Sequence, residues 1–170
     1  MAVAFDNHPS FRDYADPGRL VSASWLSARL GVKGLHVIEC NEDSVLYNIG
    51  HLTSALRINP EELVDPATLD VIDGEGFAAL LSRLGISRED TVVFYGDRGN
   101  RWACFALWVF ELFGHPDTRI LDGGREGWMQ EERDTSLTPA LVMHPSNYPV
   151  CERNDAGVRA FVDELADDDA

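Results

Sequence analysis

A polar, glycine-containing loop near the middle of the chain carries the residue types best suited to chemistry. Residues 91–94 are typical of a buried strand, and residues 102–113 are typical of a buried helix. A strand, a tight loop and a helix N-terminus in this order leave several backbone N–H groups without partners around a shallow bowl. The loop between strand and helix consists of Tyr95, Gly96, Asp97, Arg98, Gly99, Asn100 and Arg101.

Two interpretations of this loop are open. Arg98, Asn100 and Arg101 could bind a small anion together with the backbone N–H groups. Alternatively, the loop is a solvated connection whose arginines balance nearby acidic residues. Asp97 repels anions and argues against a phosphatase-like pocket. An active site would also need a reactive group, and no cysteine lies anywhere in residues 91–101.

Three cysteines are the other candidates for nucleophilic chemistry. Cys104 lies about one turn into the apolar helix, so we expect a small buried core residue with a raised thiol pKa. Cys40 follows a buried strand and is expected to pack in the core. Cys151 lies in an extended tail and is expected to be exposed, with no cradle that activates it. The odd number and wide spacing of the cysteines, with scattered histidines, predict neither a disulfide framework nor a metal site.

Composition excludes several kinds of partner. The 170 residues include 14 Lys and Arg against 29 Asp and Glu, a formal net charge of −15. This excess repels nucleic acid and anionic lipid, and the sequence has no basic stripe that could overcome it. No apolar run of membrane-spanning length and no secretory leader is visible, so we expect a cytoplasmic protein. No nucleotide-binding glycine motif is present, and we expect no cofactor.

Short apolar strands alternate with amphipathic helices along the chain. This alternation predicts an α/β domain with a mainly parallel sheet covered by helices on both faces. Ligands of such sheets bind beyond the carboxyl ends of the strands, where the strand at 91–94 enters the loop. Ser22 and Asp73 are expected to cap two helices, the first of which runs to Leu30. The expected strands are residues 20–21, 35–39, 56–58, 91–94 and 118–121.

Four stretches of sequence together resemble one family. G-H-L-T-S-A at 50–55 resembles the G-H-I-x-G-A motif near the start of rhodanese domains. L-D-G-G-R-E-G-W at 121–128 is similar to the L-D-G-G-x-x-x-W signature near their end. V-I-E-C-N-E-D at 37–43 looks like the second strand and its acidic exit in the N-terminal domain of two-domain thiosulfate sulfurtransferases. The strand ending at Tyr95 takes the place of the strand before the rhodanese active-site loop, so the resemblance covers roughly residues 20–132.

The resemblance implies a three-layer rhodanese-like fold and one half of a tandem protein. Residues 148–164 look like the linker and first helix that lead into the second domain of tandem members. We therefore expect an N-terminal arm at 1–18, a rhodanese-like domain at 19–135, and a linker with an acidic tail at 136–170. Tandem members carry the persulfide-forming cysteine in their C-terminal domain, and the N-terminal domain lacks it. The corresponding position here is Tyr95 or Gly96.

Two functions follow from the resemblance. In the first, the domain is catalytically silent and acts as a structural, binding or regulatory module, with the loop a vestige. In the second, the protein is a working thiosulfate or 3-mercaptopyruvate sulfurtransferase that uses another thiol, Cys104 or Cys151, or a partner chain that supplies the catalytic half. The expected partners are a second rhodanese domain, a second copy of the chain or a sulfur carrier. Any ligand would be a small sulfur-containing anion.

Two further expectations concern packing. His51, in the first motif, is expected to bond backbone atoms and fix a turn. The aromatic residues of the apolar helix are expected to face the core, and some of them to be exposed if a second domain normally covers this surface. These residues are Trp102, Phe105, Trp108, Phe110 and Phe113.

Overall fold

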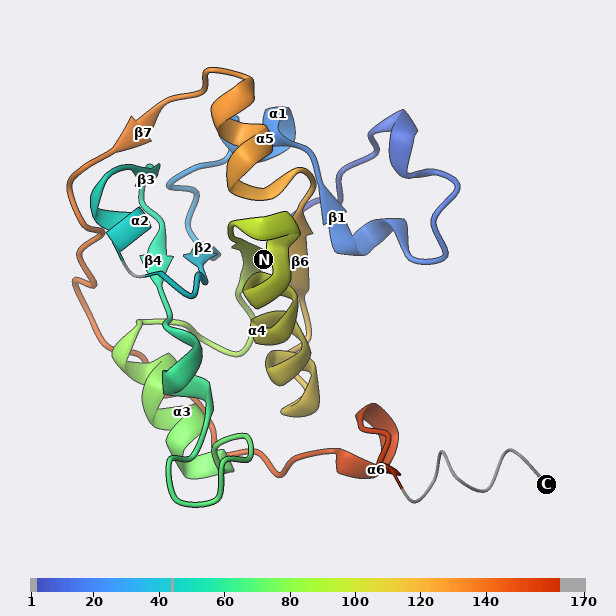
Figure 1. Ribbon diagram of the computed structural model, residues 1–170, viewed down its shortest axis with the longest axis vertical. Helices are drawn as coiled ribbons and strands as arrows, with labels where there is room; N and C mark the ends of the chain where they lie inside the picture. Colours follow the sequence, from blue (N-terminus) through green and yellow to red (C-terminus); the bar gives the residue numbers. More distant parts are fainter. Residues whose placement is uncertain (1–2, 44, 163–170) are drawn as a thin grey trace.

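Five parallel strands form the central sheet (Figure 1). The computed structural model describes residues 3–43 and 45–162. The strand order is β1-β6-β5-β2-β4, and all neighbouring pairs run parallel, as the sequence predicted. A separate antiparallel pair joins β3 (His51–Leu52) to β7 (Thr135–Ser136). The strands of the main sheet are β1 (Leu20–Val21), β2 (Leu35–Glu39), β4 (Leu56–Arg57), β5 (Thr91–Tyr95) and β6 (Thr118–Leu121).

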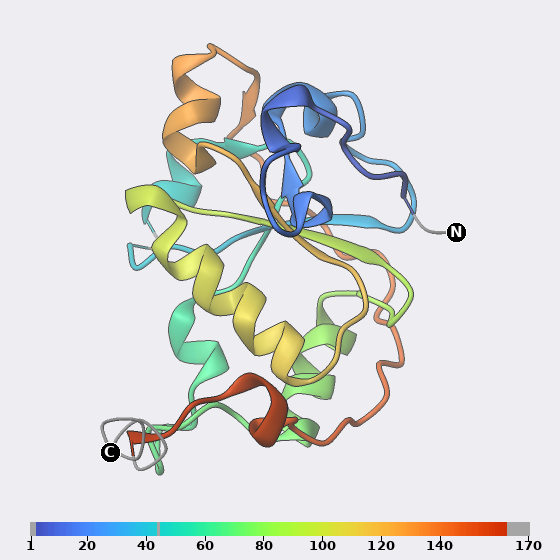
Figure 2. The ribbon, with the colours of Figure 1, turned by 90° about the vertical axis from the view of Figure 1, so that its right-hand side faces the viewer.

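Helices cover both faces of the sheet, so the fold has three layers (Figure 2). α1 (Ala23–Ser27) and α5 (Gly124–Gln130) lie on one face. α3 (Gly74–Arg83) and α4 (Arg101–Leu112) lie on the other. The three-layer α/β architecture expected from the sequence is confirmed. Shorter helices are α2 (Val45–Asn48), α6 (Asp155–Val158), η1 (Pro9–Phe11), η2 (Pro17–Arg19), η3 (Pro60–Leu63) and η4 (Arg98–Asn100).

The central strand β5 divides its side chains between the two layers. Successive residues of a strand point to opposite faces of its sheet. Val92 and Phe94 pack in the apolar cluster beneath α3 and α4, whereas Val93 and Tyr95 pack in the cluster beneath α1 and α5. All five residues of the strand are buried, which is the usual condition of a parallel strand covered on both faces. The last side chain of the strand, Tyr95, therefore points away from α4.

The predicted helix caps are confirmed, although one helix is shorter than expected. The side chains of Ser22 and Asp73 accept backbone N–H groups of α1 and α3 at 3.2 and 2.8 Å. α1 ends at Ser27 because the N–H of Arg29 bonds only three residues back, which tightens the last turn. Gly31, at φ +80°, then turns the chain toward β2.

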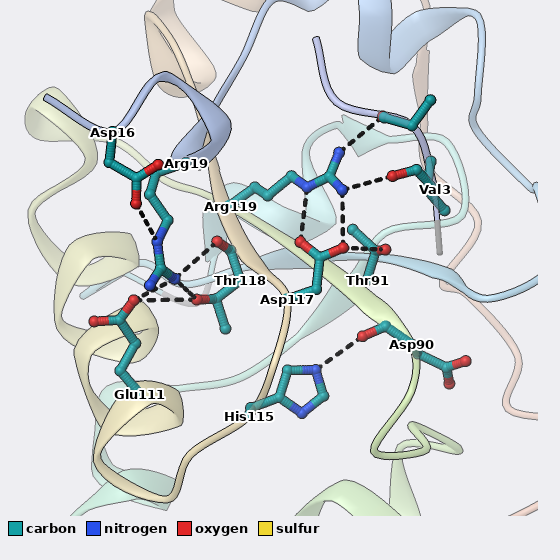
Figure 3. A network of polar contacts seen from close by, with 11 residues as sticks. Val3, Asp16, Arg19, Asp90, Thr91, Glu111, His115, Asp117, Thr118 and Arg119 are labelled. Atoms are coloured by element: carbon teal, nitrogen blue, oxygen red, sulfur yellow. Dashed lines mark hydrogen bonds and ion pairs between the residues drawn. The ribbon is translucent and has the colours of Figure 1, made fainter. Parts of the chain in front are cut away.

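The described part of the N-terminal arm, residues 3–18, is held against the sheet by Arg119 and Arg19 (Figure 3). Arg119, which is 1% exposed, donates to the carbonyl oxygens of Val3 and Ala4 at 2.7 and 3.0 Å and pairs with Asp117 at 2.8 Å. Nη1 of Arg19 donates to the hydroxyl of Thr118 in β6 at 2.6 Å, and the Arg19 guanidinium pairs with Glu111 of α4. A buried guanidinium needs an acceptor for each of its donors. The described part of the arm, which the sequence predicted to be irregular, therefore completes the packing of Arg119.

A long, mostly extended segment, residues 136–162, wraps the domain from β7 to α4 (Figures 1 and 2). We call it the C-terminal strap. Nε2 of His51 bonds the carbonyl of Thr138 at 3.0 Å. Tyr148 is buried in the apolar cluster beneath α3 and α4. Arg159 pairs with Asp70 at 3.0 Å. The expected role of His51 in fixing a turn is confirmed by its second contact, to a backbone carbonyl of α2. The acidic end at 163–170 lies outside the described residues.

Candidate functional site

The first two backbone N–H groups of the loop after β5 donate to side-chain oxygens of the protein itself. The N–H of Gly96 bonds Oδ1 of Asn100 at 2.9 Å, and the N–H of Asp97 bonds Oδ1 of Asn41 at 2.8 Å. The sequence predicted that such groups would be unpaired, and for these positions the prediction is wrong. The reason is that buried N–H groups require acceptors, and the β2–α2 connection and the loop supply them.

Arg98 lies between two acidic side chains at the rim of the loop. Its backbone N–H donates to Oε1 of Glu126 at 2.7 Å, and its guanidinium pairs with Glu42 at 2.8 Å. Its φ of +47° is unusual for a residue other than glycine. Arg98 therefore fits the second interpretation of the loop, in which the arginines balance nearby acidic residues.

Asn100 and Arg101 do not join Arg98 at a common point. Asn100 is buried at φ +63°, and its Nδ2 donates to the carbonyl of Leu121 at 2.7 Å, so it joins the loop to the end of β6. Arg101 is exposed and stacks over the ring of Trp102, with its guanidinium carbon 5.6 Å from the ring centroid. The anion-binding interpretation therefore has no common site formed by these three side chains.

A side chain at position 96 would not fit in the loop as it is folded. A Cβ added to Gly96 would lie 2.5 Å from the carbonyl oxygen of Cys40 and 3.0 Å from Oδ1 of Asn41. On the other side of the loop, a Cβ added to Gly124 would lie 2.4 Å from Oδ1 of Asn100. The contact at 2.5 Å is with backbone, which cannot swing aside as the end of a long side chain can. Position 96 is therefore closed to a reactive side chain.

Tyr95 is the other position that the resemblance matches to the reactive cysteine, and its side chain points into the core. The hydroxyl donates to the carboxylate of Glu39 and accepts the N–H of Leu52 at 3.1 Å. Burial raises the pKa of Tyr95 well above its ordinary value, and the neighbouring carboxylate adds to this shift. The phenol of Tyr95 is therefore neutral, its hydroxyl is engaged in two hydrogen bonds beneath the loop, and it is not a nucleophile.

A buried polar cluster holds the carboxyl ends of β2 and β5 together. Glu39 is 1% exposed and accepts hydrogen bonds from Tyr95, from Nδ2 of Asn41 at 2.7 Å and from Arg125 of α5 at 3.2 Å. Burial raises the pKa of Glu39, while the hydrogen bond from Tyr95 and the charge of Arg125 oppose the rise. Sequence reasoning did not single out Glu39 or Arg125. A signal was present, since an acidic residue ends a buried strand and an arginine follows the paired glycines of the L-D-G-G motif.

None of the three cysteines lies in the loop, residues 95–101, and two of them differ from expectation. Cys40 is fully buried as predicted, and burial raises its pKa to about 12. Cys104 was expected in the core but is exposed, because its position in α4 faces away from the sheet; partial desolvation still raises its pKa. Cys151 is half-buried rather than exposed, with Nη1 of Arg88 3.2 Å from its sulfur.

The described residues offer no evident place for a metal ion or a membrane span. Among residues 3–43 and 45–162, no group of three or more His, Cys, Asp or Glu side chains is arranged to hold a metal. Within the same ranges, no helix has the length and apolar character to cross a bilayer.

The fold and the loop define the class of this protein, a parallel α/β domain in three layers whose strand–loop–helix unit lies at the carboxyl edge of the sheet. The family model for the rhodanese-like domain matches residues 22–131. The chain belongs to the rhodanese-like domain family. The limits of the match agree with the range expected from the sequence motifs.

Two similar relatives with curated names are longer than this chain. The chain is 61% identical over 167 residues to a thiosulfate sulfurtransferase of Corynebacterium glutamicum, covering 97% of this chain and 55% of the relative. It is 49% identical to the putative thiosulfate sulfurtransferase SseA of Mycobacterium tuberculosis, covering 97% and 56%. The chain thus spans about half the length of the curated relatives it matches. The crystal structure of SseA from Escherichia coli, a 3-mercaptopyruvate sulfurtransferase, has the same fold, with a TM-score of 0.74 at 21% identity over 87% of this chain and 60% of that one.

Proposed function

We propose that this chain is the non-catalytic half of a thiosulfate sulfurtransferase and works by pairing with a rhodanese domain that carries the reactive cysteine. The observation that carries the proposal is the closed loop at Gly96. In sulfur transfer a thiolate attacks the outer sulfur of thiosulfate, the S–S bond breaks, sulfite leaves, and the enzyme keeps the sulfur as a persulfide. Here neither Tyr95 nor Gly96 can supply the thiolate.

The backbone of the loop supports the same proposal. A rhodanese loop that stabilises a thiolate needs free N–H groups directed at the sulfur. The N–H groups of Gly96, Asp97 and Arg98 are already donated to side-chain oxygens. A sulfur anion would have to displace two amide oxygens and a carboxylate to reach them.

The length of the relatives supports the pairing. In the two relatives named thiosulfate sulfurtransferase, the part that matches this chain makes up 55% and 56% of the protein, and the remainder is nearly as long. The resemblance of residues 148–164 to the linker of tandem members favours an N-terminal place for this half. The partner is then a second rhodanese domain, whether on the same chain or on another.

One observation favours a second function, in which the chain transfers sulfur by itself. The guanidinium of Arg88 lies 3.2 Å from the sulfur of Cys151, and a neighbouring cation stabilises a thiolate. Cys151 would then form the persulfide without the family's loop.

A thiocyanate assay separates the two functions. The chain, its Cys104→Ser and Cys151→Ser variants, and the separately expressed unmatched half of the Corynebacterium glutamicum relative are each supplied with thiosulfate and cyanide. We expect no turnover by the chain alone, and turnover by the mixture that exceeds that of the unmatched half alone. Turnover by the chain that disappears in Cys151→Ser would establish the second function instead.

A further inference from the structure

His115 lies in the turn between α4 and β6, and its buried imidazole joins two segments that are far apart in the chain. Its Nε2 atom is 2.9 Å from the backbone carbonyl oxygen of Asp90, at the entry to β5 (Figure 3). Its Nδ1 atom is 2.8 Å from the hydroxyl of Tyr148 in the C-terminal strap, and the two rings stack with their centroids 5.8 Å apart. His115 therefore connects the strap to the amino end of the central strand.

The carbonyl of Asp90 decides which nitrogen of His115 carries the proton. A carbonyl oxygen only accepts hydrogen bonds, so Nε2 is the donor. In a neutral imidazole the other nitrogen is an acceptor, and Nδ1 therefore receives the hydroxyl proton of Tyr148. A second proton on Nδ1 would point at that hydroxyl proton. The hydrogen bond that Tyr148 donates therefore exists only while His115 is neutral.

Burial and charge around His115 favour the neutral ring. Burial lowers the pKa of His115 from its ordinary value of 6.5, and the guanidinium of Arg88 adds to this shift. The hydrogen bond to the carbonyl of Asp90 and the carboxylates of Asp117 and Asp90 oppose the shift. Burial also raises the pKa of Tyr148 to about 12, so its hydroxyl keeps its own proton throughout the range in which His115 titrates.

The two carboxylates that oppose the shift are engaged with other cations or donors. Asp117 pairs with Arg119 at 2.8 Å, and the carboxylate of Asp90 lies 3.1 Å from Nε2 of His36. His115 bonds the backbone of Asp90 and not its carboxylate. Among the described residues, a proton gained by His115 would therefore have no carboxylate bonded directly to the ring.

Tyr148 anchors the strap in the apolar cluster beneath α3 and α4. It is 3% exposed, and its ring packs edge-on against Phe77 with the centroids 5.7 Å apart. Its N–H donates to the hydroxyl of Ser82 at 2.9 Å. Farther along the strap, the N–H of Asn154 donates to the carbonyl of Leu112, in the last turn of α4, at 2.8 Å. The strap reaches α4 only after this anchor, so weakening the anchor loosens the strap.

The strap meets α4 where some aromatic residues of this helix are only partly buried. Phe110 and Phe113 face the core as expected. Trp102, Phe105 and Trp108 lie on the outer side of the helix and are partly buried, which corrects the expectation that all five face the core. Nε1 of Trp108 donates to a backbone carbonyl of the strap at 3.3 Å. Release of the strap would therefore expose more of Trp108.

We propose that His115 and Tyr148 form an acid-sensitive clasp, which holds the C-terminal strap on the domain while His115 is neutral and loosens it when His115 gains a proton. This inference concerns the chain's own segment and does not depend on the proposed function. When the strap is open, the ring meets water and has its ordinary pKa of 6.5, whereas the closed strap keeps the pKa lower. The hold on the strap is therefore at full strength above pH 6.5 and is lost as the pH falls from 6.5 through the lowered pKa.

Hydrogen exchange of the strap at different pH values measures the clasp. Exchange in residues 146–158 and in β5 is followed by mass spectrometry between about pH 7.5 and about pH 5. Each rate is compared with the intrinsic rate of an unstructured chain at the same pH, which gives a protection factor. We expect the protection of the strap to fall by about fivefold or more over this range, while the protection of β5 does not fall.

Three substitutions identify the group that responds to pH. His115→Gln does not titrate but keeps one donor and one acceptor, so its strap protection should be independent of pH. His144→Gln, at an exposed position in the same strap, is the matched control. His36→Gln removes the other histidine beside Asp90. Both of these variants should keep the pH dependence of the wild type.

The wild-type protein gives a second measurement, which does not depend on how a variant folds. Long-range proton–nitrogen NMR correlations of the His115 ring report which nitrogen carries the proton. We expect the proton on Nε2 at neutral pH and a titration midpoint below the ordinary value of 6.5.

Each other outcome overturns the inference. A proton on Nδ1, or a midpoint at or above 6.5, would remove its chemical basis. Equal pH dependence of strap protection in the wild type and His115→Gln would place the responding group elsewhere. Protection of β5 that falls together with that of the strap would show that acid weakens the whole fold and not a clasp.

Discussion

The hydroxyl of Tyr95 donates a hydrogen bond to the carboxylate of Glu39, and both side chains are buried beneath the loop. The pair joins the carboxyl ends of β5 and β2, whose last residues are in register. In a parallel α/β domain this edge is where ligands usually bind. Here a neutral phenol and an acid with a raised pKa lie at this edge beneath the loop and join the two strands.

Removing the hydroxyl of Tyr95 tests how much its hydrogen bonds contribute to the stability of the fold. Tyr95→Phe leaves the N–H of Leu52 without the hydroxyl that accepts it, and a buried unpaired group is costly; it also removes one of two donors to Oε2 of Glu39, which keeps its bond from Arg125. We expect the free energy of unfolding, measured with urea, to fall by about 2 kcal/mol. Tyr14→Phe, at an exposed position, is the control and should change it by less than about 0.5 kcal/mol. Equal effects of the two substitutions would show that the Tyr95 hydroxyl has no special role.

The pH dependence of stability tests the raised pKa of Glu39. Burial raises this pKa above its ordinary value of 4.5, so the folded protein keeps the proton to a higher pH than the unfolded chain does. The contribution of Glu39 to the free energy of unfolding is then fully present below pH 4.5 and is lost as the pH rises through the raised pKa. Glu39→Gln cannot titrate, so the wild type should lose stability relative to this variant as the pH rises.

Urea unfolding of both proteins over a series of pH values from about 4 to 8 measures this difference. Glu42→Gln, an exposed carboxylate at the same rim, serves as the control. Parallel curves for the wild type and Glu39→Gln would contradict the raised pKa.

A cysteine at position 96 tests whether the loop is closed. Gly96→Cys places a Cβ against the backbone of Cys40, so we expect a loss of about 1–3 kcal/mol in stability and no gain in thiocyanate formation by the chain alone. Gly99→Cys, which has open space around its Cβ but a positive φ, separates crowding from backbone strain. A Gly96→Cys protein that forms a persulfide from thiosulfate would refute the closed loop.

Arg119 tests the part that the N-terminal arm plays in the fold. Arg119→Met removes the donor to the carbonyl groups of Val3 and Ala4 and the ion pair with Asp117, which keeps its bond from Thr91, so we expect a loss of about 3 kcal/mol or more. Hydrogen exchange of the backbone N–H groups in residues 3–19 should speed up more than exchange in β5. Arg12→Met, on the exposed part of the arm, is the control. Unchanged exchange in the arm would mean that other contacts hold it in place.

Much of the fold could be predicted from local pattern. The strands of the main sheet and the caps at Ser22 and Asp73 depend on residue types at short spacing, and the structure has them where expected, whereas the β3–β7 pair was not predicted. Cys104 was misplaced because an apolar neighbourhood in the sequence indicates a core residue. The direction in which its side chain points depends on how α4 lies on the sheet.

What the sequence by itself determined is the family and the absence of a thiol in the loop, because both depend on residue identity. Only the tertiary structure decided that the bowl is filled. Two of the three acceptors for its N–H groups come from Asn41 and Glu126, which are 56 and 28 residues away from the groups they bind. Such pairs meet only when parallel strands place their carboxyl ends at one edge of the sheet. Residue types at short spacing therefore do not predict contacts between residues so far apart in the chain.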